Sequence, residues 1–215
     1  MEIENQQIMA KIMNFCHELE NEFDQIAKER KEKLSQLSNY ISTKIEEGQT
    51  PKIVVICTHN SRRSHIGQIW LATGAEYFQI PEIQTFSGGT EATAFNIRAV
   101  RAFQRIGFDI SAKEETENPI YQISWKEEMK AYQAFSKKYE EAPNPKENFA
   151  AIMVCSEADA GCPFVLGCDF RLSLPYDDPK GYDGTKLEAE KYDERVKQIG
   201  REMLYVLSNV SKLKQ

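Results

Sequence analysis

The spacing of hydrophobic residues divides the chain into a helical first part and a longer part in which strands and helices alternate. Over residues 8–45, apolar side chains recur at intervals of three and four, which is the period of an amphipathic helix. Gly48 and Pro51 then follow in the order that ends a helix. We therefore predict an α-helical extension over residues 1–50 and a further domain over residues 51–215.

Beyond residue 50, short β-rich segments alternate with segments of helical period. The predicted strands are residues 52–57, 84–87, 149–154 and 171–174, and the predicted helices are residues 64–78, 96–106 and 185 onward. Thr185 and Glu188 have the spacing of a capping box at the start of the last helix. A polar segment at about 112–148 is predicted to be an insertion. The alternation as a whole favours an α/β fold with a parallel sheet.

The composition is that of one globular domain with an extension, since 41% of the 215 residues are hydrophobic and 28% are charged. No apolar stretch approaches the roughly 20 residues of a membrane span, and residues 1–5 lack the pattern of a secretion signal. The odd number of cysteines, five, argues against a disulfide framework, so we expect reduced thiols and a cytoplasmic location. The net charge of -6 disfavours nucleic acid as a partner but leaves an anionic substrate open.

The segment after the first strand has the pattern of an anion-binding loop. Residues 53–57 form a buried-strand pattern and a helix begins near Ser64, so Cys57 is expected at the carboxyl end of a strand, facing a helix N-terminus. Five residues separate Cys57 from Arg63, a span that lets backbone N–H groups surround one tetrahedral oxyanion while Arg63 binds two of its oxygens. The predicted substrate-binding residues of this loop are Thr58, His59, Asn60, Ser61, Arg62 and Ser64.

The same positive potential favours the thiolate of Cys57, which can then act as a nucleophile without a histidine base. Ser64 is placed to donate a hydrogen bond to the thiolate, Asn60 is expected to shape the loop, and His59 to brace it. The alternative, a buried cysteine at a strand end before a polar turn, fits a lone cysteine better than it fits the complete string.

Residues 54–64 resemble the anion loop shared by low-molecular-weight protein tyrosine phosphatases and thioredoxin-coupled arsenate reductases. Residues 86–91, 96–100 and 106–110 resemble the second βα unit of that superfamily. The resemblance covers roughly residues 52–111 and 149–214, and leaves the N-terminal helices and the insertion outside. It implies a three-layer α/β fold with a short four-stranded parallel sheet in flavodoxin-like order.

Catalysis also needs an acid that protonates the leaving oxygen. The resemblance assigns this role to Asp178, in the segment Pro175 to Pro179, with the neighbouring Asp177 as its rival.

Two further cysteines distinguish a reductase from a phosphatase. In the reductases that this segment resembles, the arsenate adduct on the nucleophile is attacked by a second cysteine, and a third then takes over the disulfide for thioredoxin. Carried over, these are Cys57, Cys155 and Cys162. The six residues between Cys155 and Cys162 would have to loop out, because a helical turn holds Cα atoms beyond the ~7 Å limit for a disulfide. The alternative, a core thiol at Cys155 and an inert surface thiol at Cys162, stays open.

The chain departs from the reductase pattern at two positions. Arg62 stands where these reductases commonly carry another cysteine, but that cysteine is not one of the three reacting thiols, so its loss does not exclude reduction. Gln68 stands where some carry a carboxylate for potassium, so that ion is not predicted. We also expect no other bound metal or cofactor. Cys168 either competes as a disulfide partner or packs, and Cys16 is expected in the core.

The leading hypothesis is reduction of arsenate to arsenite. The alternative is hydrolysis of phosphotyrosine or small phosphomonoesters through a cysteinyl phosphate, using Cys57, Arg63 and Asp178 alone. A third hypothesis is a non-catalytic phosphate-binding or partner-binding module. The aromatic residues of the insertion are expected to anchor it rather than form a lid, and the pattern leaves open whether the N-terminal helices wrap the core or form a dimer.

Overall fold

The computed structural model describes residues 2–80, 83–124, 132–161 and 164–213. Its centre is a four-stranded parallel sheet in the order β2-β1-β6-β7. The strands are β1 (Lys52–Cys57), β2 (Gln84–Gly89), β6 (Phe149–Met153) and β7 (Cys168–Ser173). Residues 53–57 of β1 and all of β6 are buried, which explains their continuous apolar sequences.

This sheet confirms the predicted fold class, including the flavodoxin-like order with the first strand in second place. Cys57 at the end of β1 is level with Gly89 of β2, and Ile56 is level with Met153 of β6. The carboxyl ends of the three strands therefore meet at one edge of the sheet.

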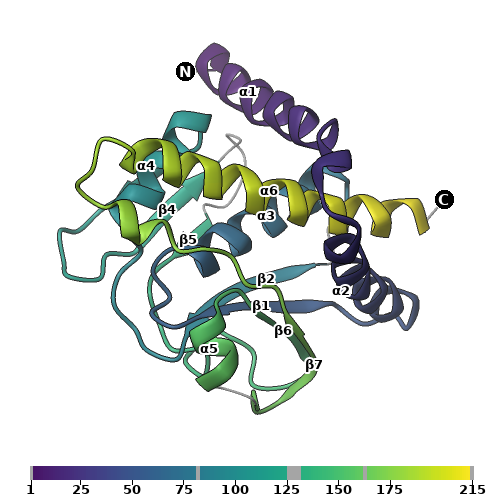
Figure 1. Cartoon of the computed structure of the whole chain (residues 1–215). Helices are drawn as coiled ribbons and strands as arrows, with labels where there is room; N and C mark the ends of the chain where they lie inside the picture. Colours follow the sequence, from purple (N-terminus) through teal and green to yellow (C-terminus); the bar gives the residue numbers. More distant parts are fainter. Residues whose placement is uncertain (1, 81–82, 125–131, 162–163, 214–215) are drawn as a thin grey trace.

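Helices lie on both sides of the sheet (Figure 1). The long helix α6 (Glu188–Leu213) packs on α3 (Arg63–Tyr77), and α3 packs on β1 and β2. The shorter helix α4 (Ile97–Ile106) also packs on α6, while α5 (Ser156–Gly161) lies on the other side, against β1 and β6. At the start of α6, the Thr185 hydroxyl accepts from Leu187 N and the Glu188 carboxylate from Gly184 N, a variant of the predicted capping box.

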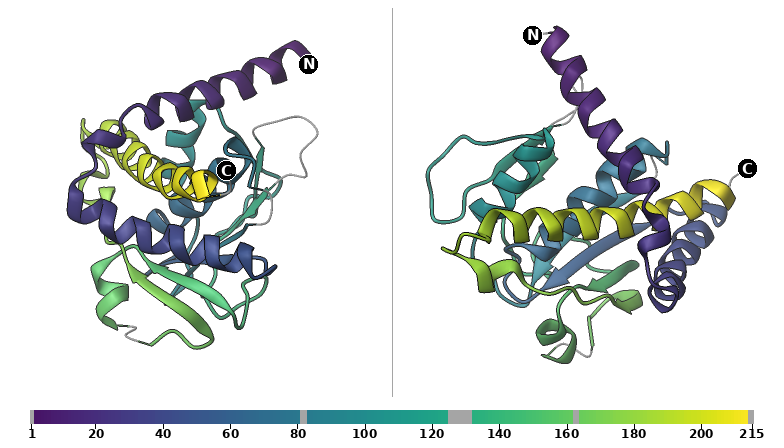
Figure 2. Two further views of the ribbon diagram at one scale, coloured as in Figure 1. Left: turned by 90° about the vertical axis from the view of Figure 1, so that its right-hand side faces the viewer. Right: turned by 45° about the horizontal axis from the view of Figure 1, so that its top comes forward.

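The N-terminal helices pack on the core of the domain. In Figure 2, α1 (Glu2–Glu20) crosses α6, and α2 (Lys28–Glu46) runs beside α6, after the short η1 (Phe23–Gln25). Ile12, Cys16, Leu19, Leu34, Leu37 and Ile41 are fully buried. Cys16 therefore lies in the core, as predicted. Burial raises the pKa of its thiol to about 12.

The insertion and the residues just before it contain strands that the sequence did not predict. β3 (Asp109–Ala112), β4 (Tyr121–Ser124) and β5 (Tyr132–Ala134) form a separate antiparallel sheet. These strands have only three or four residues each, and β4 alternates between buried and partly buried positions, which is too short a pattern to recognise. Tyr121, Tyr132 and Tyr139 pack on the core, which agrees with an anchoring role, whereas Trp125 lies outside the described residues.

Within the described ranges, no helix has the length and apolar character required to cross a membrane.

Candidate active site

The loop between β1 and α3 runs from Cys57 to the N-terminus of α3. Cys57 is 4% exposed, and α3 begins at Arg63. Among the described residues, no protein acceptor takes a hydrogen bond from the backbone N–H groups of residues 58–62. Unpaired amides next to a helix N-terminus favour an anion, so the loop has the donors that the sequence predicts.

A chain of hydrogen bonds fixes the side chain of Cys57. Asn60 is fully buried with a positive φ of 43°, which turns the backbone within the loop. Its Nδ2 donates to Ser64 Oγ at 2.9 Å, and Ser64 Oγ lies 3.0 Å from Cys57 Sγ. Because Ser64 Oγ accepts from Asn60, its own proton is directed to the sulfur, where it stabilises a thiolate. Both residues thus have the geometry expected from the sequence.

Ser136 and Lys137 of the insertion form hydrogen bonds with the loop, and the sequence did not predict this contact. Asn60 Oδ1 accepts from Lys137 N at 2.9 Å, and Ser136 Oγ donates to the His59 carbonyl at 3.0 Å. Gly89 N donates to the Lys137 carbonyl at 2.9 Å. A Cβ on Gly89 would lie 2.7 Å from Thr58 O and 2.7 Å from Asn60 N, so only glycine fits between β2 and the loop.

Neither histidine near the loop is arranged as a base for Cys57. The His59 side chain is 48% exposed and lies 3.5 Å from Glu91, so this residue takes part through its carbonyl. His65 is fully buried against Phe95, with Nδ1 3.2 Å from Ser87 Oγ. Burial, and then the charge of Lys137, holds the pKa of His65 well below 6.5, so it is neutral at physiological pH.

Lys137 is a buried cation beneath the loop. Its side chain donates to the Phe135 carbonyl at 3.3 Å and lies 4.6 Å from the centre of the Phe135 ring. Burial lowers the pKa of Lys137 to about 8, which keeps the ammonium form dominant at neutral pH.

The Arg63 guanidinium is bound to the segment that carries Asp178. Its Nη1 donates to the Tyr176 carbonyl at 2.8 Å, and its Nη2 donates to Asp178 Oδ2 at 2.8 Å. The Nε atom is buried without an acceptor in the described part of the chain. A buried guanidinium donor without a partner is costly, and an oxyanion held by the loop would supply the acceptor.

The structure brings Asp178, and not Asp177, to the loop. Asp178 Oδ1 accepts from Lys180 N at 3.0 Å, as the cap of η2 (Pro179–Tyr182), while Oδ2 faces Arg63. The Asp177 side chain is 98% exposed and lies 3.7 Å from Arg195. The geometry therefore favours Asp178 over its rival as the proton donor.

Arg62 contributes its backbone to the loop, while its side chain points to α6. Its Nε donates to the Tyr192 hydroxyl at 2.8 Å, and its Nη2 lies 3.4 Å from Asp183. The side chain thus supports the segment before α6.

Cys155 lies immediately beside the loop. It follows β6, and Val154 N donates to the Ile56 carbonyl at 2.9 Å, which aligns Cys155 with the loop that begins at Cys57. Cys155 is fully buried, 3.4 Å from the Thr58 hydroxyl and 3.4 Å from Ala158 N. Cys162, the predicted third cysteine, lies outside the described residues.

Cys168 lies at the opposite end of the sheet. It is level with Phe149, the first residue of β6, whereas Cys155 follows the last residue of that strand. At ~3.3 Å per strand residue this separation is about 20 Å, which is too far for a disulfide with Cys155.

Two observations bear on other kinds of site. Among the described residues, no group of three or more His, Cys, Asp or Glu side chains could hold a metal ion. The Gln68 amide nitrogen donates hydrogen bonds to Thr85 O and to the Tyr132 hydroxyl, so its donors are taken up by protein acceptors.

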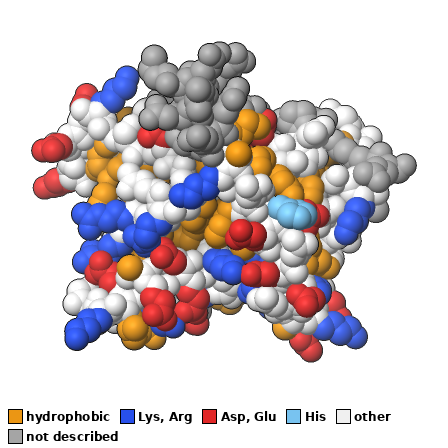
Figure 3. Space-filling view, turned by 90° about the horizontal axis from the view of Figure 1, so that it is seen from above, with side chains coloured by type: hydrophobic (Ala, Val, Ile, Leu, Met, Phe, Trp, Pro, Cys, Tyr) orange, Lys and Arg blue, Asp and Glu red, His pale blue; other side chains and the backbone are white. Residues whose placement is uncertain are grey.

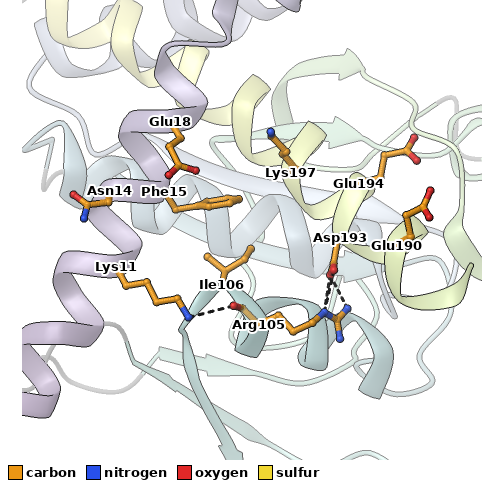
Figure 4. A pocket seen from close by; sticks show the side chains of 10 residues that line it. All are labelled: Lys11, Asn14, Phe15, Glu18, Arg105, Ile106, Glu190, Asp193, Glu194 and Lys197. Carbon is orange, nitrogen blue, oxygen red and sulfur yellow. Dashed lines mark hydrogen bonds and ion pairs between the residues drawn. The ribbon is translucent and has the colours of Figure 1, made fainter.

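A groove of about 780 Å³ lies apart from the loop, between α1, α4 and α6. Hydrophobic side chains are visible among charged ones on this face of the molecule (Figure 3), and Figure 4 shows the groove lined by Phe15 and Ile106 together with charged residues. Arg105 pairs with Asp193 there, and the lining includes no cysteine. Cys57 therefore lies outside this groove.

Comparison with known proteins gives the family. No family model matches the chain. The chain is 30% identical to an arsenate reductase of Brevibacillus brevis over 136 residues, which are 63% of this chain and 82% of that protein. It is 29% identical to arsenate reductase 2 of Staphylococcus epidermidis over 129 residues, 60% of this chain and 79% of that protein.

A solved structure shows the same fold. A YwlE mutant from Bacillus subtilis superposes with a TM-score of 0.51 and 14% sequence identity, over 77% of this chain and 99% of that chain. This likeness shows the fold, and the sequence relatives bear out the resemblance to the arsenate reductases. The chain is an enzyme of the arsenate reductase family.

Proposed function

We propose that this enzyme reduces arsenate to arsenite through Cys57, Cys155 and Cys162. The observation that carries the proposal is the fully buried Cys155 beside the nucleophile loop, 3.4 Å from Thr58. Hydrolysis of a phosphate ester needs no second thiol at this place, whereas reduction of an oxyanion does. The names of the sequence relatives support the same substrate.

In the first step, the amides of residues 58–62 and Arg63 bind arsenate in front of the Cys57 thiolate. The sulfur attacks arsenic, a sulfur–arsenic bond forms, and one arsenate hydroxyl group leaves. Asp178 gives this hydroxyl a proton, so it departs as water. Ser64 holds the thiolate before the attack, at a sulfur–oxygen distance of 3.0 Å.

In the second step, the Cys155 thiolate attacks the Cys57 sulfur. A disulfide forms between these two cysteines, the sulfur–arsenic bond breaks, and its electron pair stays on arsenic. Two thiols are thereby oxidised, and arsenic(V) is reduced to arsenic(III) and released as arsenite. Cys162 then attacks Cys155, which restores the Cys57 thiolate and leaves a Cys155–Cys162 disulfide.

The third thiol reaches Cys155 only if the segment after β6 rearranges, because α5 occupies residues 156–161 between the two cysteines. This short helix is held by Asp159, which accepts from Arg171 Nη2 at 2.6 Å and from Ser173 Oγ at 2.7 Å. The last disulfide is reduced by the dithiol of thioredoxin, an external partner, and a relay of reduced thiols suits the cytoplasm.

The test measures arsenite release and para-nitrophenyl phosphate hydrolysis in parallel, with and without thioredoxin. Cys155→Ser and Cys162→Ser are compared with Cys168→Ser, a control that removes a cysteine at the other end of the sheet. We expect thioredoxin-dependent arsenite turnover in wild type and Cys168→Ser, and none in the two relay variants. If wild type releases no arsenite while hydrolysis persists in all variants, phosphomonoester hydrolysis through Cys57, Arg63 and Asp178 is the function instead.

A further inference from the structure

The position of Arg63 depends on a residue that is itself held from outside the loop. Arg63 Nη1 donates to the Tyr176 carbonyl at 2.8 Å, in the segment that also carries Asp178. Tyr176 N in turn donates to the Val154 carbonyl at 3.1 Å. Any displacement of Tyr176 would therefore move an acceptor of Arg63 and the adjoining acid loop together.

The Tyr176 side chain is fixed by a buried carboxylate of α6. Its hydroxyl donates to Glu202 Oε2 at 2.7 Å, and both side chains are at most 5% exposed. Burial, and then the charge of Glu202, raises the pKa of Tyr176 well above 10, so the hydroxyl keeps its proton and remains a donor.

The charge of Glu202 is balanced from the N-terminal extension. Arg30, in the first turn of α2, donates from Nε to the same Glu202 Oε2 at 2.7 Å, and its guanidinium carbon lies 4.6 Å from the centre of the Tyr176 ring. Arg30 thus makes two contacts with this pair, an ion pair to Glu202 and a cation–π contact with Tyr176. Within the described part of the chain, no second cation forms an ion pair with Glu202.

We propose that Arg30 is a positioning residue for the oxyanion site, acting through Glu202 and Tyr176 on Arg63. The inference rests on the proposed function only in taking Arg63 as the residue that binds the oxyanion. The N-terminal extension is then a structural part of the active site, although it lies outside the segments that resemble the superfamily.

Removal of Arg30 leaves the Glu202 carboxylate buried without a counter-charge, which is strongly unfavourable. The carboxylate can regain solvation only by drawing in water or moving outward, and the Tyr176 hydroxyl is bonded to it. The Tyr176 carbonyl and Arg63 then lose their fixed geometry. Replacing Glu202 by glutamine at the same time removes the unbalanced buried charge. The glutamine amide oxygen still accepts a hydrogen bond from the Tyr176 hydroxyl.

The experiment measures the affinity for inorganic phosphate as protection of Cys57 against iodoacetate. It compares wild type, Arg30→Met, Arg30→Lys and Arg30→Met/Glu202→Gln, at a temperature where circular dichroism shows every variant folded. Lys33→Met is the matched control, since it removes one exposed cation from the same helix.

We expect Arg30→Met to raise the phosphate Kd about tenfold, which is ~1.4 kcal/mol. We expect the double variant to return to within about threefold of wild type, and Lys33→Met to leave the Kd unchanged. Arg30→Lys keeps the charge but loses the planar contact with Tyr176, so a rise of about threefold is expected even if Arg30→Met does not fold.

A phosphate Kd in both Arg30 variants within about twofold of wild type would overturn the inference, and so would a double variant that binds as weakly as Arg30→Met. A merely structural role would lower the melting temperature without changing the Kd of the folded enzyme. Phosphate binding requires no reduction, so loss of phosphate affinity in Arg30→Met would support the inference even in an enzyme that releases no arsenite. If Arg30→Met releases arsenite and its phosphate affinity is unchanged, the inference is wrong but the proposed function stands.

Discussion

Substitution of Lys137 by methionine should stabilise the enzyme at neutral pH, and the gain should shrink as the pH rises. Lys137 is 3% exposed, and burial lowers its pKa from 10.5 to about 8. The difference of ~2.5 units corresponds to about 3 kcal/mol, which the folded protein loses by keeping this ammonium buried at pH 7. Methionine fills similar space without a charge, but it gives up the bond to Phe135 O, worth about 1 kcal/mol. The expected net gain at pH 7 is therefore about 2 kcal/mol.

The sign of the pH dependence follows from the lowered pKa. Below pH 8 the lysine is charged in both states, so the full destabilisation is present. Between pH 8 and 10.5 the folded state releases the proton while the unfolded state keeps it, so the unfolding free energy of wild type rises with pH. Glu141, whose charge raises the pKa of Lys137, is common to both proteins. Burial, the larger cause of the lowered pKa of His65, also acts in both, so His65 is neutral from neutral pH upward with or without Lys137.

Urea unfolding of wild type and Lys137→Met at pH 7 and pH 9.5 measures this difference. We expect the advantage of the variant to narrow by about 2 kcal/mol between the two pH values. A difference that stays constant with pH would refute the reasoning, because it would mean that Lys137 does not titrate abnormally in the folded state.

Three further substitutions test the site. Ser64→Ala removes a hydrogen bond to the Cys57 thiolate worth about 2 kcal/mol. The rate of alkylation of Cys57 by iodoacetate and the arsenite turnover should therefore both fall, the turnover roughly 30-fold. Turnover equal to that of wild type would contradict this role. Asp178→Asn should lower kcat about 100-fold or more with phosphate affinity largely retained, whereas Asp177→Asn, at an exposed position, should match wild type; reversed results in steady-state assays would make Asp177 the acid. Asp159→Asn weakens the attachment of α5 to β7, so the Cys155–Cys162 disulfide should form faster in stopped-flow thiol assays. A rate no faster than that of wild type would contradict the required rearrangement of α5.

The parts of the site that sequence could predict are local in the chain. The strand, loop and helix around Cys57 follow from a continuous apolar run, a polar stretch and a helical period, and these fix where Cys57 and Arg63 lie. Asp178 could be proposed only through the family resemblance, and the structure adds that its carboxylate reaches Arg63.

The contacts that sequence missed join residues far apart in the chain. Lys137 N reaches Asn60 across 77 residues, and Arg30 reaches Glu202 across 172 residues. A lysine in a polar insertion and an arginine in a charged helix look like ordinary solvated side chains, because nothing in their neighbourhood marks them as buried. These two residues take up their positions only when the insertion and the extension pack on the core.

A single turnover without thioredoxin tests the central claim most directly. Fully reduced enzyme is mixed with excess arsenate, arsenite is counted per protein molecule, and the cysteines are mapped by mass spectrometry after acid quenching. The account predicts one arsenite per enzyme and a disulfide between Cys155 and Cys162, with Cys57 recovered as a free thiol. Enzyme that releases no arsenite and keeps all three thiols reduced would contradict it.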